Sequence, residues 1–307
     1  MFASQFLPRF VTTGILAAFM SFGGDAANAL YDVSPGEIPG KPGSIIRVWP
    51  LEGGGPGMGG SGGEAFRILY RSMDPSGRPI PVSGAIYIPG GAAPAGGRNI
   101  IAWAHPTSGV MPPCAPSLMP DVGGMMWNLP NMISQGYIVV ATDYPGLGTD
   151  GIHPYLIGES EARSVLDSVR AARELPNTGA SNRFAVWGHS QGGHAALYTG
   201  EVAARYAPDL KLVGVAAAAP ATYLVELFDA DESTSQDLVA MTVLSWTRLK
   251  NIPVANVVEP QAMSAFEATA RDCIESVSEF EKIERDVLIT KGGKQVAGLG
   301  PVMQDGQ

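Results

Sequence analysis

A serine flanked by small residues is the group in this sequence best placed to act as a nucleophile. Ser190 lies in the pentapeptide Gly188-His189-Ser190-Gln191-Gly192, which has the Gly-x-Ser-x-Gly pattern of a serine held in a tight turn between a strand and a helix. The backbone of such a serine is strained, and Gly188 and Gly192 remove the clashes that larger side chains would cause. The pattern predicts covalent catalysis, in which Ser190 attacks a carbonyl carbon and becomes acylated.

The oxyanion that forms in this attack requires hydrogen-bond donors. The backbone N–H of Gln191 is the first expected donor, because the helix that follows the serine directs its free N–H groups and its positive dipole end at the same point. A second donor is expected from the loop at residues 104–109, which follows another predicted strand. Pro106 lacks an N–H, so Thr107 or Ser108 must donate, and their hydroxyls could add a further bond.

The base and acid that would activate Ser190 are not found after it in the sequence. A catalytic serine needs a base and a group that orients the base, and after this kind of turn the acid and then the histidine follow along the chain. The histidines are His105, His153, His189 and His194. His194 alone follows Ser190, and it lies one turn inside the predicted helix, from which its ring cannot easily return to the serine. His153 stays open as a base, because triads are recognised by geometry and not by order.

The elements that must position Ser190 alternate along the chain. Short apolar runs predict strands, and the last four suit strands buried on both faces of a parallel sheet. These runs lie at residues 44–51, 66–70, 82–88, 99–103, 137–142, 183–187 and 210–218. The turn sequence at residues 74–77 predicts a hairpin, and helical spacing of apolar residues predicts helices at 159–175 and 191–207. This alternation predicts an α/β fold with a core at residues 30–220.

The pattern changes after Pro220. Residues 221–290 are helix-like and contain no good buried strand, which we interpret as a helical cap inserted after the sixth core strand. The alternative is that these helices cover the sheet. The tail at residues 291–307 ends where a further strand would start, so we expect a truncated tail and missing last core strands. The strand at residues 210–218 would then be an uncovered apolar edge, which promotes aggregation.

The N-terminal segment and the charge limit location and partners. Arg9 precedes an apolar run at residues 11–22 that is too short for a stable membrane span, and Ala27-Asn28-Ala29 fits a cleavage site. We expect residues 1–29 to be a signal peptide cleaved after Ala29, and the protein to be secreted, extracellular or periplasmic; the alternative is an uncleaved N-terminal anchor. The net charge of −9 excludes a nucleic-acid partner that needs clustered Lys and Arg.

The two cysteines, Cys114 and Cys273, would form a disulfide in an oxidising compartment. The alternative is two unrelated buried thiols. His, Cys and Asp do not cluster at ligand spacing, so we expect no metal and no cofactor.

Four stretches together resemble the secretory lipase family of the α/β-hydrolase superfamily, found in bacteria and fungi. They are residues 103–117, which include Cys114-Ala115-Pro116-Ser117, and residues 141–148, 153–164 and 188–195. The likeness extends from about residue 34 to about residue 221, and Pro106 departs from it because related chains usually have glycine there. The resemblance implies an α/β-hydrolase fold, serine attack on a carboxylic ester, a triad completed by aspartate and histidine, a helical cap that shapes the acyl pocket, and a disulfide at Cys114.

The expected function is therefore that of a secreted serine carboxylester hydrolase, a lipase that acts on triacylglycerol or another lipid or small ester in lipid catabolism, at a lipid–water interface. One alternative is a serine exopeptidase on the same fold, with cap carboxylates binding the substrate's α-amino group. The candidate carboxylates are Glu226, Asp229, Asp231 and Glu232. The other alternative is a truncated, catalytically incompetent lipase-like chain, which we would expect to be poorly soluble with little esterase activity.

Overall fold

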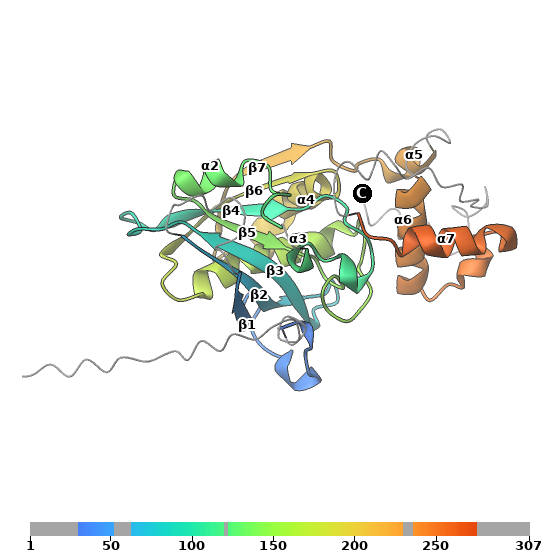
Figure 1. Cartoon of the computed structure of the whole chain (residues 1–307). Helices are drawn as coiled ribbons and strands as arrows, with labels where there is room; N and C mark the ends of the chain where they lie inside the picture. Colours follow the sequence, from blue (N-terminus) through green and yellow to red (C-terminus); the bar gives the residue numbers. More distant parts are fainter. Residues whose placement is uncertain (1–29, 52–62, 120–121, 230–235, 275–307) are drawn as a thin grey trace, which may run out of the picture.

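A computed structural model describes residues 30–51, 63–119, 122–229 and 236–274 (Figure 1). The expected signal peptide, residues 275–290 of the expected cap and the tail at 291–307 lie outside the described residues. The described strands form one sheet in the order β1-β2-β3-β5-β4-β6-β7. Their bounds are β1 (Ile45–Pro50), β2 (Glu64–Met73), β3 (Pro79–Ile88), β4 (Arg98–Ala104), β5 (Ile138–Thr142), β6 (Ala180–His189) and β7 (Lys211–Ala218).

The sheet has an antiparallel part and a parallel part. Strands β1, β2 and β3 pair antiparallel, and β3 also pairs antiparallel with β5. Strands β5, β4, β6 and β7 are parallel. The predicted hairpin turn joins β2 to β3, with Gly77 at φ 82° and its N–H donating to the carbonyl of Asp74 at 2.9 Å. All of the predicted strands are present, and the predicted α/β class is confirmed.

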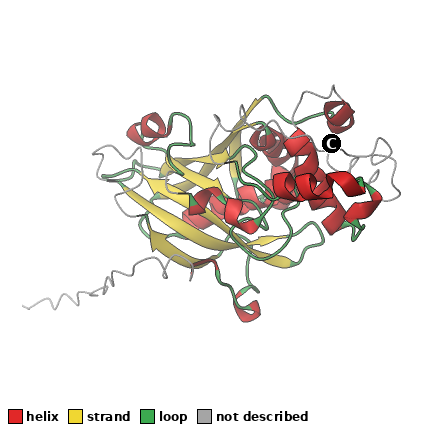
Figure 2. Cartoon of the chain, turned by 45° about the vertical axis from the view of Figure 1, so that its right-hand side comes forward, coloured by secondary structure: helices red, strands yellow, loops and turns green. Residues whose placement is uncertain are grey.

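Helices cover both faces of the sheet (Figure 2). Helices α3 (Gly158–Glu174) and α4 (Gln191–Tyr206) pack on one face, and the short α2 (Leu129–Ser134) packs on the other. The buried side of α3 carries Val165 and Val169, as its helical spacing predicts. The apolar core therefore lies mainly between α3, α4 and the middle of the sheet.

Strand β7 forms where it was predicted. The interpretation of its apolar run as a strand buried on both faces was wrong, whereas the exposed apolar edge expected at residues 210–218 is present in the described sheet. Strand β7 is the edge strand of the described sheet next to β6, and the side chains of Val213 and Val215 are 48% and 41% exposed. An apolar run favours a strand, whereas the burial of that strand requires other elements to pack on its faces. Helix α4 packs on β7, and Leu212 and Ala217 contact the core, but no described strand pairs with its outer edge and Val213 and Val215 stay partly exposed.

The helices after β7 form a separate group beside the end of the sheet (Figure 1). They are α5 (Leu224–Asp229), α6 (Gln236–Leu249) and α7 (Met263–Ala270). Their buried side chains, such as Leu244 and Phe266, form an apolar cluster with Val110, Tyr155 and Leu156, which belong to loops of the core. These helices follow β7, the last strand of the described sheet, in the part of the chain for which a helical cap was expected.

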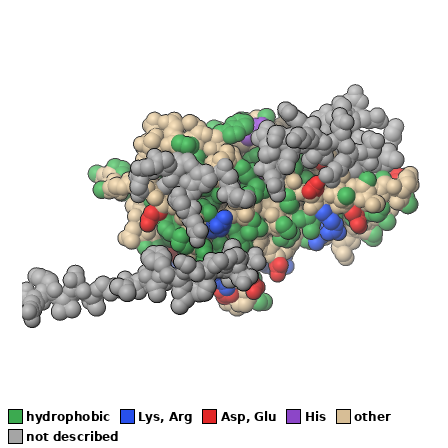
Figure 3. Space-filling view, in the orientation of Figure 1, with side chains coloured by type: hydrophobic (Ala, Val, Ile, Leu, Met, Phe, Trp, Pro, Cys, Tyr) green, Lys and Arg blue, Asp and Glu red, His purple; other side chains and the backbone are tan. Residues whose placement is uncertain are grey.

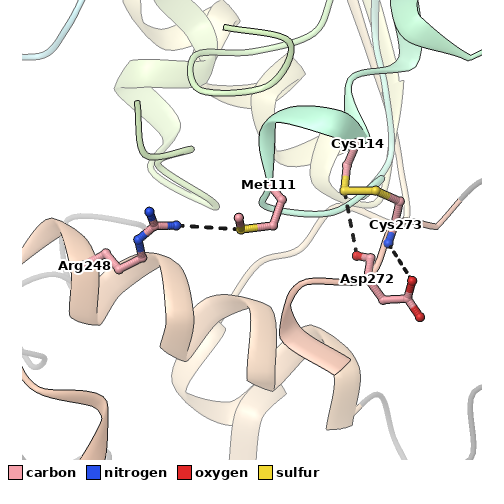
Figure 4. Close-up of a disulfide and its surroundings, with 5 residues drawn as sticks. All are labelled: Met111, Cys114, Arg248, Asp272 and Cys273. Atoms are coloured by element: carbon pink, nitrogen blue, oxygen red, sulfur yellow. Dashed lines mark hydrogen bonds between the residues drawn. A yellow bond between two sulfur atoms is a disulfide. The ribbon is translucent and has the colours of Figure 1, made fainter. Parts of the chain in front are cut away.

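A disulfide joins this group of helices to the core (Figure 4). Cys114 and Cys273 are bonded across 159 residues of sequence, so the predicted disulfide is confirmed and the alternative of two unrelated thiols was wrong. Nearby, the guanidinium of Arg248 on α6 contacts the sulfur of Met111 at 3.7 Å (Figure 4). The end of α7 and the loop after β4 are thus held together covalently.

Candidate active site

Ser190 lies at the turn between β6 and α4 with a backbone conformation that few non-glycine residues adopt. Its φ is 56° and its ψ is −120°. Its N–H donates to the carbonyl of Ala218 at the end of β7 (2.9 Å), and its carbonyl accepts from His194 (3.0 Å) and Ala221 (3.3 Å). The strained conformation is therefore enforced by hydrogen bonds on both sides of the serine, as strain at functional sites generally requires.

The two glycines of the pentapeptide are needed because the backbone is crowded around the serine. A Cβ at Gly188 would lie 2.2 Å from the carbonyl oxygen of Gly192, and a Cβ at Gly192 would lie 1.9 Å from that of Ala104. Both distances are far below van der Waals contact. The pairing of Gly188 with Ala104 in the β6–β4 ladder brings the two strand ends together.

Ser190 and the predicted oxyanion loop therefore lie at the same edge of the sheet. Strands β4 and β6 are parallel neighbours. From β4 the chain continues to β5 on one side of this pair, and from β6 it continues to β7 on the opposite side. This is a topological switch point, where ligands bind beyond the carboxyl ends of the strands in open α/β sheets. The loop at residues 104–109 begins at this point, next to the turn that carries Ser190.

The hydroxyls of Thr107 and Ser108, the loop residues expected to donate to an oxyanion, differ in their hydrogen bonds. The Thr107 hydroxyl is hydrogen-bonded to the hydroxyl of Tyr155 at 2.7 Å. The Ser108 hydroxyl is buried and has no hydrogen-bond partner among the described residues. No described backbone acceptor is paired with the N–H of Thr107 or Ser108. These N–H groups and that of Gln191, in the first turn of α4, are the donors that the arrangement leaves available.

The four histidines of the chain are all described, and none makes a hydrogen bond to the Ser190 hydroxyl. The ring of His105 is buried between the carbonyls of Pro106 (2.6 Å) and Asp143 (3.1 Å), and burial lowers its pKa. The ring of His189 packs against Trp127, with 5.4 Å between ring centroids. These two histidines are therefore engaged away from the serine.

His153, which the sequence left open as a base, is also engaged elsewhere. Its Nδ1 donates to the carbonyl of Pro145 at 2.9 Å, and its Nε2 lies 3.0 Å from the side-chain nitrogen of Gln191. Burial lowers its pKa to about 4, so the ring is neutral at neutral pH. Both ring nitrogens are occupied, and His153 does not act as the base of Ser190 in this arrangement.

Sequence reasoning missed a buried glutamate. Glu161 on α3 is fully buried, and its carboxylate bonds to the ring of His194 at 2.7 Å and to the side-chain nitrogen of Gln191 at 2.9 Å. The sequence places His194 one turn inside the helix, and its ring contacts Glu161 there. The available signal was that Glu161 stands four residues before Val165, on the apolar face of the helix, where an acidic residue is unexpected.

Other site hypotheses find no support in the described residues. Asp231 and Glu232, and the side chains of Glu226 and Asp229, lie outside what the structure describes, so the exopeptidase alternative stays a hypothesis. In the described ranges, no three His, Cys, Asp or Glu side chains gather at a spacing suited to a metal ion. No described helix has the length and apolar character needed to cross a membrane.

Comparison with known proteins identifies relatives named as an esterase and as a lipase. The chain is 26% identical over 236 residues to the trichothecene C-3 esterase of Fusarium sporotrichioides, covering 71% of this chain and 51% of the esterase. It is 24% identical over 266 residues to a probable inactive lipase of Mycobacterium tuberculosis, covering 83% of this chain and 57% of that protein. The chain thus spans about half the length of these curated relatives.

A solved structure confirms the α/β-hydrolase fold. Candida antarctica lipase A in its closed state superposes with a TM-score of 0.72 at 17% identity, covering 87% of this chain and 65% of the lipase. The family model of secretory lipases matches residues 122–290, which include the Ser190 turn and exceed half of the sequence. The chain therefore belongs to the secretory lipase family.

Proposed function

We propose that this protein is a secreted serine carboxylester hydrolase with Ser190 as its nucleophile. The observation that carries the proposal is the backbone of Ser190, at φ 56° and ψ −120° between a parallel strand and a helix N-terminus. This conformation presents a side chain at the carboxyl edge of the sheet, directly before the free N–H groups of α4. Such a serine is suited to acyl transfer.

In the proposed reaction, Ser190 Oγ attacks the ester carbonyl carbon while its proton passes to a base. The tetrahedral oxyanion accepts hydrogen bonds from the Gln191 N–H and from the loop donors at Thr107 and Ser108. Its collapse breaks the bond to the alkoxy oxygen, which leaves as the alcohol after taking up the proton. Water then hydrolyses the acyl-serine to release the carboxylic acid. None of the four histidine rings is hydrogen-bonded to the Ser190 hydroxyl, so we assign the base to none of them.

A lipid ester is the substrate class that we propose. Apolar side chains are exposed on α4, at the residue before α5 and on α5 itself: Leu197 is 43%, Tyr223 72%, Val225 39% and Leu227 38% exposed. Leu197 and Tyr223 line the same cavity of about 110 Å³, so they belong to one surface. Figure 3 shows hydrophobic side chains interspersed with polar ones over the described part of one face. An exposed apolar surface beside the chain that follows Ser190 suits contact with a lipid–water interface.

The proposal also covers secretion and the division of the chain into domains. We propose that residues 1–29 are removed after Ala29, that residues 30–220 form the hydrolase core and that residues 221–290 form the cap. The family is described as secretory, and the described helices after β7 pack in an apolar cluster that is distinct from the main core cluster and includes Val110, Tyr155 and Leu156 of the core loops. Intact-mass measurement of the exported protein should show Leu30 as its first residue, and an N-terminus elsewhere would contradict the cleavage site.

The experiment that tests the proposed chemistry is active-site labelling combined with ester hydrolysis. The folded full-length protein would be treated with a fluorophosphonate probe and assayed with p-nitrophenyl butyrate and a tributyrin emulsion. We expect the probe on Ser190 alone, with labelling and hydrolysis both lost in Ser190→Ala. Ser181→Ala, at a half-buried serine near the start of β6, is the matched control and should behave like the wild type.

The outcomes separate the competing hypotheses. Turnover of p-nitrophenyl butyrate without turnover of tributyrin would favour a small ester over a lipid. Cleavage of a proline anilide in preference to either ester would favour the exopeptidase. A folded protein that is neither labelled nor active would show a lipase-like chain without catalytic competence.

A further inference from the structure

A buried carboxylate contacts the first turn of the helix that follows Ser190. Glu161 Oε2 accepts from His194 Nδ1 at 2.7 Å, and Glu161 Oε1 accepts from Gln191 Nε2 at 2.9 Å. Gln191 and His194 are the first and fourth residues of α4. One side chain of α3 is therefore bonded to two side chains of the helix turn whose N–H groups face the proposed oxyanion.

Gln191 is held from a second direction. His153 Nδ1 donates to the carbonyl of Pro145 at 2.9 Å, so its Nε2 is the acceptor of the neutral ring. The side-chain nitrogen of Gln191 lies 3.0 Å from that acceptor. Both protons of the Gln191 amide are thus used, one toward His153 and one toward Glu161. The rotamer of the residue after the nucleophile is fixed by two bonds that only an NH₂ group in this position can make.

The surroundings explain why Glu161 can be buried and why its bonds are strong. No Lys or Arg among the described residues pairs with it. Its carboxylate instead lies at the first turns of α3 and α4, whose dipoles are positive at that end, and it also accepts from the N–H of Leu156 at 3.2 Å. A buried carboxylate is strongly destabilised when its hydrogen-bond donors are removed. The position of the Gln191 side chain is therefore tightly coupled to that of Glu161.

We infer that Glu161 is a positioning residue for the reaction at Ser190. It acts through Gln191, whose side chain it holds and whose backbone N–H is the proposed oxyanion donor. The inference rests on the proposed function, because an oxyanion must form at Ser190 for the position of that N–H to matter. Glu161 does not touch the reacting atoms. Its effect is geometric, since a displacement of a catalytic donor by about 1 Å can reduce a rate by about two orders of magnitude.

The test compares single and double variants in the fluorophosphonate reaction of Ser190. In Glu161→Gln, a neutral amide replaces a carboxylate acceptor and presents an NH₂ group to at least one of the groups that donate to Glu161. We expect the maximal labelling rate to fall roughly tenfold or more, with less than a twofold change in the probe's dissociation constant. Gln191→Met keeps the backbone N–H but loses the amide, and it should cause a similar fall.

A double-variant cycle shows whether Glu161 acts through Gln191. If it does, the double variant should react no more slowly than Gln191→Met alone, because the shared contact is already absent. Asp167→Asn is the matched control. This carboxylate is also buried on α3, but its partners are Ser72, Tyr206 and Arg170. Asp167→Asn should change the labelling rate only slightly. When it is combined with Gln191→Met, the fold-change of the double variant should equal the product of the two single fold-changes.

A second readout does not depend on reactivity. The N–H of His194 donates to the carbonyl of Ser190 at 3.0 Å, so its hydrogen exchange reports the order of the first turn of α4. Glu161→Gln should speed this exchange at least fivefold while the exchange of the last turn of α4 stays unchanged. Asp167→Asn should leave His194 unaffected.

The outcomes distinguish the inference from the function on which it rests. Wild-type protein that is not labelled would overturn the proposed function, and the exchange of His194 would still decide whether Glu161 orders the turn. Labelled wild type with an equally reactive Glu161→Gln variant would overturn the inference alone. Independent effects of the two substitutions in the cycle, or unchanged exchange at His194, would also overturn it.

Discussion

The α-carbon of Gly192 lies against the end of β4 so closely that a Cβ there would be 1.9 Å from the carbonyl oxygen of Ala104. This contact joins the turn that carries Ser190 to the strand that leads into the oxyanion loop. The distance between nucleophile and oxyanion donors therefore depends on the absence of a side chain at residue 192.

Gly192→Ala should separate these two segments. A methyl group at this position must displace backbone, which typically costs about 1–3 kcal/mol of stability, and the labelling of Ser190 should fall at least tenfold. Urea unfolding and fluorophosphonate kinetics measure the two effects. Gly36→Ala is the control, because a Cβ at Gly36 would meet nothing within 4 Å. An alanine at 192 that leaves both stability and labelling intact would show that the contact is not restrictive.

Asp143 should make stability depend on pH. Its buried carboxyl accepts hydrogen bonds from the Ser117 N–H (2.8 Å) and the Ser83 hydroxyl (2.6 Å), yet burial raises its pKa from 3.8 to about 6. Between these two pH values the folded state holds more protons than the unfolded state, so the stability from this group is present below pH 4 and is lost as pH rises through 6.

We therefore expect the wild type to lose on the order of 3 kcal/mol of stability relative to Asp143→Asn between pH 4 and pH 7. Urea unfolding of both proteins at several pH values measures the difference. Asp150→Asn, which removes a carboxylate from an exposed residue, controls for the change in net charge. A difference that moves in the opposite direction would mean that the hydrogen bonds to Asp143 outweigh its desolvation.

The disulfide should stabilise both the fold and the oxyanion loop. It closes a loop with a sequence separation of 159 residues, for which chain entropy predicts about 5 kcal/mol. Beside it, the N–H of Ile274 donates to the carbonyl of Ser108 at 2.9 Å. The double variant Cys114→Ser, Cys273→Ser should unfold at lower urea and label more slowly at Ser190.

Reduction provides an internal check of this prediction. Dithiothreitol should bring the wild type to the stability of the double variant and should not affect the variant. Equal stability of the oxidised and reduced wild type would refute the expected contribution.

Tyr155 should transmit the packing of the cap to the oxyanion loop. Its carbonyl accepts from the indole N–H of Trp246 on α6 at 2.8 Å, and its hydroxyl bonds to that of Thr107 at 2.7 Å. Tyr155→Phe removes only the second bond and leaves Thr107 unpaired, so we expect a loss of about 1 kcal/mol with slower labelling of Ser190. Thr107→Val combined with Tyr155→Phe completes a double-variant cycle. Additive effects in that cycle would exclude a coupling through this bond.

Much of the framework could be predicted from local patterns. The apolar runs that became β4, β5 and β6 and the helical spacing of Val165 and Val169 lie within single elements, where the periods of strands and helices act directly. The glycines around Ser190 likewise predict their turn, because only residues without a Cβ fit its crowded backbone. These features depend on neighbours a few residues apart.

Burial of β7 could not be predicted in this way. Its sequence is as apolar as that of the inner strands, yet Val213 and Val215 are partly exposed, because β7 is the edge strand of the described sheet. Whether an apolar strand is covered depends on which other elements reach it.

The sequence by itself determined the elements, the strained turn at Ser190 and the residue types around it. Only the tertiary structure decided which residues contact each other. It joins Cys114 to Cys273 in a disulfide, and it brings Glu161 within hydrogen-bond distance of Gln191, which is 30 residues later in the chain. It also occupies the rings of His153 and His194 in that buried network, away from the Ser190 hydroxyl. The physical reason is that these bonds form where two helices and two loops meet at one edge of the sheet, and the energy of a buried carboxylate depends on all of its donors together.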